Sequence, residues 1–200
     1  MIRTIIFDIG NVLTDFRWKD FFAEKGYTGE VYERLCKATV TSPDWCEYDR
    51  GVLTEEEILN RFVENDPGIE KEIREALRDT KGMVTPRDYA VPWVKELKSK
   101  GYQVLYLSNF SAKIERECAD SLGFLPYTDG GILSYKDYVI KPRPEIYLLL
   151  LHRFGLDPDE CVFLDDTQQN LDAAAEFGIH TILYTDRESA LAELVKLGVE

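Results

Sequence analysis

The sequence has no long apolar run, and it has few cysteines, few histidines and fewer basic than acidic residues. A membrane-spanning helix needs roughly 20 consecutive apolar residues, and no segment approaches that length. The apolar run after Met1 is also too short for the apolar region of a secretory signal. We therefore expect a cytoplasmic protein that does not bind membranes.

Cysteine and histidine offer no metal or redox site. The four cysteines are widely separated and form no C-x-x-C pair, and the two histidines, His152 and His180, are far apart as well. We therefore expect reduced thiols and core or surface histidines.

Basic residues are outnumbered: 24 Lys and Arg stand against 37 Asp and Glu, which gives a formal net charge of −13. A field of this sign repels nucleic acid, so we expect no nucleic-acid partner. The same field should also repel small anionic substrates. The length of 200 residues and the 44% hydrophobic content predict one folded core, with room for a modest insertion. We expect a monomer or a weak dimer.

The pattern of apolar residues changes twice along the chain. Residues 3–7 form a short β-branched run typical of a buried strand, whereas the segment from Asp15 to about Thr80 has a helical pattern throughout. Within it, Thr54 and Glu57 have the spacing of a capping box. After Tyr89, strand and helix patterns alternate. This predicts an α/β fold, in which residues 1–14 and 85–200 form a Rossmann-like core with a parallel sheet and residues 15–84 form an inserted helical cap.

Polar residues directly follow three of the predicted strands. They are Asp8, the pair Ser108-Asn109 and the pair Asp165-Asp166. In an open parallel sheet the carboxyl ends of the strands line one edge, where such folds bind ligands. The sequence therefore predicts one crevice that receives all three groups, joined by Lys141 from a further loop.

Four ordered motifs make the chain resemble the haloacid dehalogenase superfamily of hydrolases. They cover nearly the whole chain, and the helices inserted after the first motif resemble the small cap domain of that family. Within it, Asp-x-Gly-Asn-Val and Asp-Asp-x-x-x-Asn are most similar to the small sugar-phosphate phosphatases, such as glucose-1-phosphate phosphatase and the phosphatase domain of soluble epoxide hydrolases. The motifs are Ile5-Ile-Phe-Asp-Ile-Gly-Asn-Val-Leu13, Leu107-Ser-Asn109, Lys141-Pro-Arg-Pro-Glu-Ile-Tyr147 and Val162-Phe-Leu-Asp-Asp-Thr-Gln-Gln-Asn170.

The resemblance implies a phosphatase in which Asp8 attacks phosphorus and forms an aspartyl-phosphate. A carboxylate can approach a phosphate only if a cation compensates the charge, which predicts Mg²⁺. The expected direct ligands are the side chains of Asp8 and Asp166 and the carbonyl of Gly10, with Asp165 acting through a bound water or by orienting the site.

Donors are expected around the phosphate oxygens as well as the metal. Ser108 and Lys141 are predicted to take part in catalysis as donors to the transferring group, and Lys141 also places positive charge beside Asp8. The predicted phosphate-binding residues are Gly10, Asn11, Ser108, Asn109 and Lys141.

Position 10 departs from the commonest pattern of the resembled family, in which a second aspartate acts as general acid and base. A proton-transfer group contributes about 10²- to 10⁴-fold to rate, so its loss weakens turnover. Three explanations stay open: the branch with Asp-x-Gly-Asn-Val tolerates glycine, another carboxylate reaches in, or the substrate has a good leaving group. The candidate carboxylates are Asp15, Glu47 and Asp49.

The cap is expected to decide the substrate, because it can cover the strand ends. Trp45, Tyr48 and Arg50 combine aromatic surface with hydrogen-bond donors and suit a sugar ring, although aromatic residues at helical spacing also suit the core of the cap.

We therefore predict a Mg²⁺-dependent phosphatase acting on a small phosphorylated metabolite, with a sugar phosphate as the best candidate. One alternative is a 2-haloacid dehalogenase, which needs no metal. The other is a catalytically weakened protein that binds a phosphorylated ligand, and Gly10 is its supporting feature.

Overall fold

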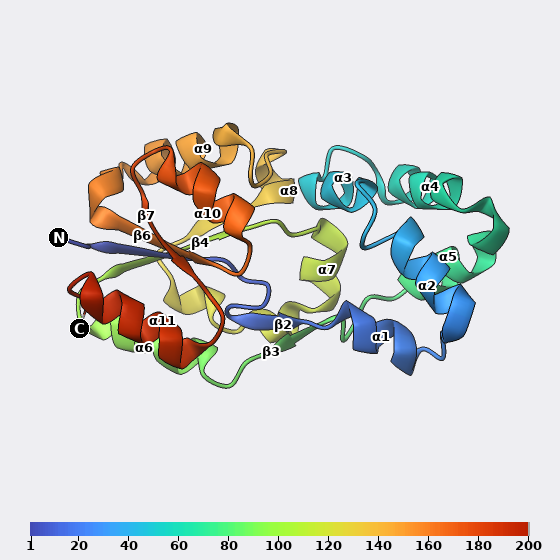
Figure 1. Cartoon of the computed structure of the whole chain (residues 1–200), viewed down its shortest axis with the longest axis horizontal. Coiled ribbons are helices and arrows are strands. Elements are labelled where there is room, and N and C mark those ends of the chain that lie inside the picture. The colour runs from blue at the N-terminus through green and yellow to red at the C-terminus, as the bar shows by residue number, and fades with distance from the viewer. Residues whose placement is uncertain (200) are drawn as a thin grey trace.

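A five-stranded parallel sheet lies at the centre of the computed structural model, which describes residues 1–199 (Figure 1). The first strand is in the middle, paired on either side with strands from the second half of the chain. In spatial order the strands are β5 (Gly131–Leu133), β4 (Gln103–Ser108), β1 (Thr4–Phe7), β6 (Cys161–Asp165) and β7 (His180–Leu183).

Helices cover both faces of this sheet, as the alternating pattern predicted. Ile6 of β1 packs with residues of α9 and α10, whereas Ile5 and Phe7 belong to the cluster that includes α6 and α11. This confirms the α/β class and the Rossmann-like sheet. The helices outside the cap are α6 (Ala90–Ser99), α7 (Ala112–Glu117), α8 (Ser134–Asp137), α9 (Pro144–Phe154), α10 (Gln168–Ala175) and α11 (Arg187–Lys196). Short 3₁₀ helices span Pro67–Ile69, Ala119–Leu122, Leu125–Tyr127 and Pro158–Glu160.

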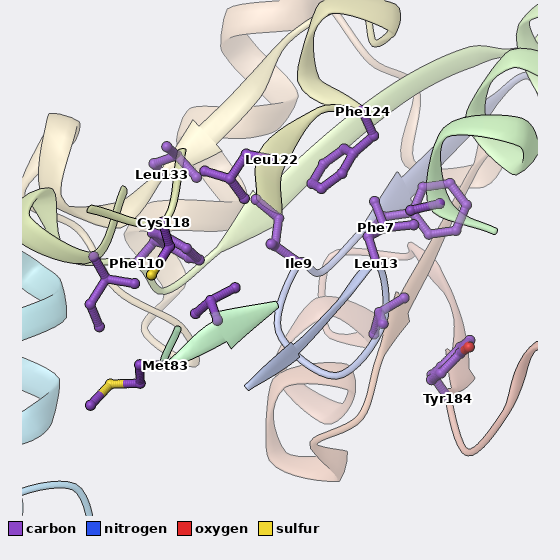
Figure 2. Close-up of a cluster of buried hydrophobic side chains, with 14 of the residues drawn as sticks. Phe7, Ile9, Leu13, Met83, Phe110, Cys118, Leu122, Phe124, Leu133 and Tyr184 are labelled. Carbon is purple, nitrogen blue, oxygen red and sulfur yellow. The ribbon is translucent and has the colours of Figure 1, made fainter. Parts of the chain in front are cut away.

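The β1 strand forms because its apolar residues are buried on both sides, as a central parallel strand requires. Phe7 lies edge-on to Trp93, with ring centroids 4.8 Å apart. Figure 2 shows Phe7, Ile9 and Leu13 in the same apolar cluster, so the apolar core continues past the end of β1. The loop that follows Asp8 is thereby anchored to the core by the side chains of Ile9 and Leu13.

Five helices form the cap at one end of the molecule, beyond the carboxyl ends of the strands (Figure 1). The capping box is confirmed: the Thr54 hydroxyl accepts from the Glu57 amide, and the Glu57 carboxylate accepts from the Thr54 amide. The proposed domain limits stay a prediction. The cap helices are α1 (Trp18–Glu24), α2 (Gly29–Ala38), α3 (Asp44–Arg50), α4 (Glu55–Asn65) and α5 (Glu70–Leu77).

A small antiparallel sheet of two strands joins the cap to the core, and here the predicted secondary structure was wrong. We expected helix from Asp15 onward, but β2 (Thr14–Phe16) pairs antiparallel with β3 (Val84–Pro86). The two strands are separated by the whole cap, so their pairing leaves no mark on the local pattern of either segment. Asp15 is further held by Arg87, whose guanidinium lies 2.7 Å from its carboxylate.

Glu117, a partly buried carboxylate of α7, binds the segment around Thr80 by which the chain leaves the cap. It accepts hydrogen bonds from the amide and hydroxyl of Thr80, both at 2.7 Å, and pairs with Lys113 at 2.6 Å. Partial burial raises the pKa of Glu117, but the bonds from Lys113 and Thr80 outweigh it and lower the pKa to about 2.

Glu117→Gln should therefore lower the free energy of unfolding by about 1–2 kcal/mol at pH 7. Because the pKa is lower in the folded state than its ordinary value of 4.5, this stabilisation is present above about pH 4.5 and is lost as the pH falls towards 2. Urea unfolding of both proteins at pH 7 and pH 3 measures the difference. A difference as large at pH 3 as at pH 7 would show that the charge of Glu117 does not stabilise this junction.

Over residues 1–199, no helix is both long enough and apolar enough to cross a membrane.

Candidate functional site

Three carboxylates meet where two neighbouring strands end. Phe7 is aligned with Leu164, so Asp8 and Asp165 leave the sheet side by side, and Asp166 follows. One oxygen from each of the three carboxylates lies within 4.8 Å of the others. Hard divalent cations prefer such an oxygen-rich set, so these residues fit a metal such as Mg²⁺. The convergence predicted from the strand ends is what the structure contains.

A buried lysine supplies the positive charge at this cluster. The Nζ atom of Lys141 lies 2.9 Å from Asp8 Oδ1 and 2.6 Å from Asp165 Oδ2, and the lysine is 3% exposed. Burial alone disfavours a charged amine, but the two carboxylates hold the pKa of Lys141 well above its usual value. The amine therefore stays charged, and it lies directly beside the Asp8 carboxylate.

Asp165 is held by a complete set of donors. Besides Lys141, it accepts from the Asn170 side-chain amide at 3.1 and 3.0 Å and from the Thr167 backbone amide at 2.8 Å. It is fully buried and does not line the cavity described below. This geometry suits a residue that orients Lys141 and the loop after β6.

Burial of the Asp8 carboxylate raises its pKa to about 7, with Lys141 opposing that shift and Asp165 adding to it. Its Oδ1 atom accepts from the Ile9 amide at 2.7 Å. Because burial raises the pKa of Asp8, a cation bound beside it would favour the ionised form of this carboxylate.

Two asparagines predicted to bind phosphate are engaged in holding the site together. Asn11, in the left-handed conformation at φ 56°, donates to Asp166 at 2.8 Å. Asn109 exchanges two hydrogen bonds with the backbone of Lys141, at 2.8 and 3.0 Å. Both side chains border the cavity, but their observed bonds position other residues.

A cavity of about 220 Å³ opens above this cluster, between the strand ends and the cap. Most of the predicted site residues border it, whereas Asp165, Tyr48 and Arg50 do not. Tyr48 packs against Trp45 and Phe62 instead, and Arg50 pairs with Glu47 on its own helix. The predicted site residues at the cavity are Asp8, Gly10, Asn11, Trp45, Ser108, Asn109, Lys141 and Asp166.

The three carboxylates weighed as substitutes at position 10 have different surroundings. Asp49 lines the cavity together with Asp8. Asp15, on β2, is paired with Arg87, and Glu47 is paired with Arg50. Neither carboxylate borders the cavity.

Asn170 is a site residue that the sequence interpretation quoted in a motif but did not assign. Its side chain donates to both oxygens of Asp165, and it borders the cavity. The signal was its position in the first turn of α10, which faces back towards Asp165 at the end of β6.

The walls away from the carboxylates are mainly apolar. Phe16, Trp45, Val84, Phe110 and Ile114 border the cavity from the cap, the small two-stranded sheet and the segment that runs into α7. The site thus combines a charged floor, able to hold a cation and an anionic group, with walls that suit a less polar organic part.

Comparison with known proteins agrees with this arrangement. A model of the haloacid dehalogenase-like hydrolase family matches residues 2–178. Flavin mononucleotide hydrolase 1 of Arabidopsis thaliana is 24% identical, over 78% of this chain and 62% of that protein. A sesquiterpene phosphatase of Aspergillus oryzae is 24% identical, over 98% of this chain and 96% of that protein. Other curated relatives are much longer, and the chain spans 19% and 30% of the length of two of them.

The fold also matches solved structures. A HAD family enzyme from Bacteroides thetaiotaomicron, solved with magnesium and inorganic phosphate, superposes with a TM-score of 0.70 and 22% identity, over 96% of this chain and 99% of that one. At this identity the match establishes the shared fold.

Proposed function

The chain belongs to the haloacid dehalogenase-like hydrolases, and from this premise we propose that it is a Mg²⁺-dependent phosphatase that forms an aspartyl-phosphate on Asp8. The observation that carries the proposal is the cluster of Asp8, Asp165 and Asp166 with the buried amine of Lys141 at one edge of the sheet. Relatives named as phosphatases support it.

In this proposal Asp8 and Asp166 hold the metal, with the carbonyl of Gly10, and Asp165 orients the site. When bound, Mg²⁺ neutralises charge on the phosphate and lets a carboxylate approach phosphorus. Asp8 forms the bond to phosphorus, Ser108 donates to a phosphate oxygen, and Lys141 compensates the charge that gathers beside Asp8.

The proposed substrate is a small organic phosphate. The sugar phosphate predicted from Trp45, Tyr48 and Arg50 stays a prediction, and only Trp45 of these three lies at the cavity. The apolar walls support an organic part with an apolar or planar face, so the substrate panel should set sugar phosphates against aryl and isoprenyl phosphates.

Metal and phosphate should bind together. With Mg²⁺ absent, the carboxylates repel an anion, so inorganic phosphate should bind about tenfold or more tightly when Mg²⁺ is present, and Mg²⁺ should gain the same factor from phosphate. Titration calorimetry with Mg²⁺ and with EDTA measures both affinities. Phosphate affinity that is equal in the two conditions would exclude the proposed metal site.

Assays of the substrate panel, extended to 2-haloacids, also distinguish the phosphatase from a dehalogenase and from a protein that only binds phosphorylated ligands. Metal-dependent phosphate release supports the phosphatase, and EDTA should abolish it. Halide release from 2-haloacids that EDTA does not suppress would favour a dehalogenase. Binding of phosphorylated ligands without turnover would favour a protein that only captures them.

A further inference from the structure

Asp49 is a carboxylate of the cap that faces the reacting groups across the cavity. It lies one helical turn after Trp45 in α3, and both residues border the same space as Asp8. Among residues 1–199, no donor forms a hydrogen bond to its carboxylate, whereas its backbone carbonyl accepts from the Ser134 hydroxyl. Its side chain is therefore available to a molecule in the cavity.

The other ionisable groups that border the cavity already have partners there. Asp8 and Asp166 belong to the carboxylate cluster, and Lys141 is paired with Asp8 and Asp165. Within the described chain, Asp49 is the one remaining ionisable side chain on the cavity wall.

A phosphatase site needs a proton source that neither Asp8 nor Lys141 can supply. When the bond from phosphorus to an ordinary alcohol oxygen breaks, the oxygen leaves as a strong base unless a proton reaches it. Asp8 acts as the nucleophile and must be ionised, and Lys141 stays charged between two carboxylates. Burial and the repulsion of Asp8 raise the pKa of Asp49 to about 8, with Lys141 opposing, so its carboxyl group carries a proton at neutral pH.

Contacts between cap and core fix the position of Asp49. The hydroxyl of Ser134, at the start of α8, donates to the Asp49 carbonyl at 2.5 Å, and the Ser134 hydroxyl oxygen in turn accepts from the Phe110 amide at 2.8 Å. Gly51, at φ 73°, ends α3 so close to Tyr135 that a Cβ there would lie 2.6 Å from the tyrosine Cβ. Figure 1 shows α3 and α8 side by side, so the end of α3 is held against the core.

We propose that Asp49 is the proton-transfer residue of this site, contributed by the cap rather than by the loop that follows β1. Its carboxyl group gives a proton to the leaving oxygen as Asp8 bonds to phosphorus and the phosphorus–oxygen bond to the alcohol breaks. Its carboxylate then takes a proton from the water that attacks phosphorus, which releases phosphate and restores Asp8. This inference rests on the proposed phosphatase function.

The dependence on leaving group tests the role of Asp49. In Asp49→Asn, kcat/KM for an alkyl phosphate should fall by about 10²-fold or more, because the alkoxide now leaves without a proton. For 4-nitrophenyl phosphate, whose leaving group is a stable anion, kcat/KM should change less than about threefold. Slower hydrolysis of the intermediate should also produce a burst of 4-nitrophenol.

Two further variants complete the experiment. Glu47→Gln removes a carboxylate of the same helix that does not border the cavity, and it should behave as the unchanged protein. Asp49→Glu keeps the proton donor and should recover part of the alkyl phosphate activity. Thermal unfolding and Mg²⁺ affinity of each variant show whether the fold and the metal site are intact.

Equal losses with both substrates, or no loss with either, would overturn the assignment of Asp49 while the unchanged protein still hydrolyses phosphate esters through Asp8. If the unchanged protein hydrolyses neither substrate in the presence of Mg²⁺, the proposed function itself fails. The two failures are therefore distinguished in one set of assays.

Discussion

Asp8→Asn should lose essentially all phosphatase activity, with kcat reduced by about 10⁴-fold or more, because the amide cannot attack phosphorus. The side chain keeps its size, and the substitution removes a buried carboxylate that burial disfavours, so the variant should remain folded. Steady-state assays on the best substrate of the panel, with Mg²⁺ present, measure the loss. Acid quenching with labelled substrate should give labelled Asp8 in the unchanged protein and no label in the variant.

Asp159→Asn provides the matched control. Asp159 is exposed and precedes β6, at the edge of the sheet away from the site, so this variant should keep full activity. An Asp8→Asn protein that retains more than a few per cent of activity would show that another group attacks phosphorus.

Lys141→Met should lower both stability and activity, because it removes the one positive charge that pairs with both Asp8 and Asp165 within the described structure. A buried charge left without its partner costs about 3–5 kcal/mol, so the free energy of unfolding should fall by that order near neutral pH. Activity should fall by about 10²- to 10³-fold, the usual effect of losing one donor at developing charge.

Urea unfolding with EDTA present, so that no cation replaces the amine, and kinetics with Mg²⁺ present measure these two effects. Lys136→Met is the control: Lys136 is half-exposed and pairs with Glu115, and a surface pair is worth about 1 kcal/mol or less. If Lys141→Met and Lys136→Met had the same free energy of unfolding and the same activity, the buried amine of Lys141 would contribute no more than a surface lysine.

The sequence was sufficient for the α/β core and for the charged edge of its sheet, because both depend on local patterns. The short edge strand β5 (Gly131–Leu133) was not among the predicted strands. An apolar run followed directly by a polar residue identifies the end of a buried strand, and Asp8, Ser108 and Asp165 all follow that rule. Parallel pairing then brings the three strand ends together without further information.

The remaining features depend on contacts between distant segments. The β2–β3 pairing joins residues on either side of the cap, and no local period encodes it. The orientation of α3 decides that Asp49 faces the cavity while Tyr48 packs against Phe62, and that orientation is set by the contacts of α3 with α4 and α8. Helical spacing groups Trp45 with Asp49, but it does not say which face of α3 is turned towards Asp8.

The stereochemical course at phosphorus distinguishes transfer through Asp8 from direct attack by water. A phosphorothioate ester made chiral at phosphorus with oxygen isotopes would be hydrolysed with Mg²⁺ present, and the configuration of the released thiophosphate determined. Transfer to Asp8 and then to water consists of two displacements, each of which inverts the phosphorus centre, so we expect overall retention. Overall inversion would show that water attacks the substrate directly, and it would contradict an aspartyl-phosphate on Asp8.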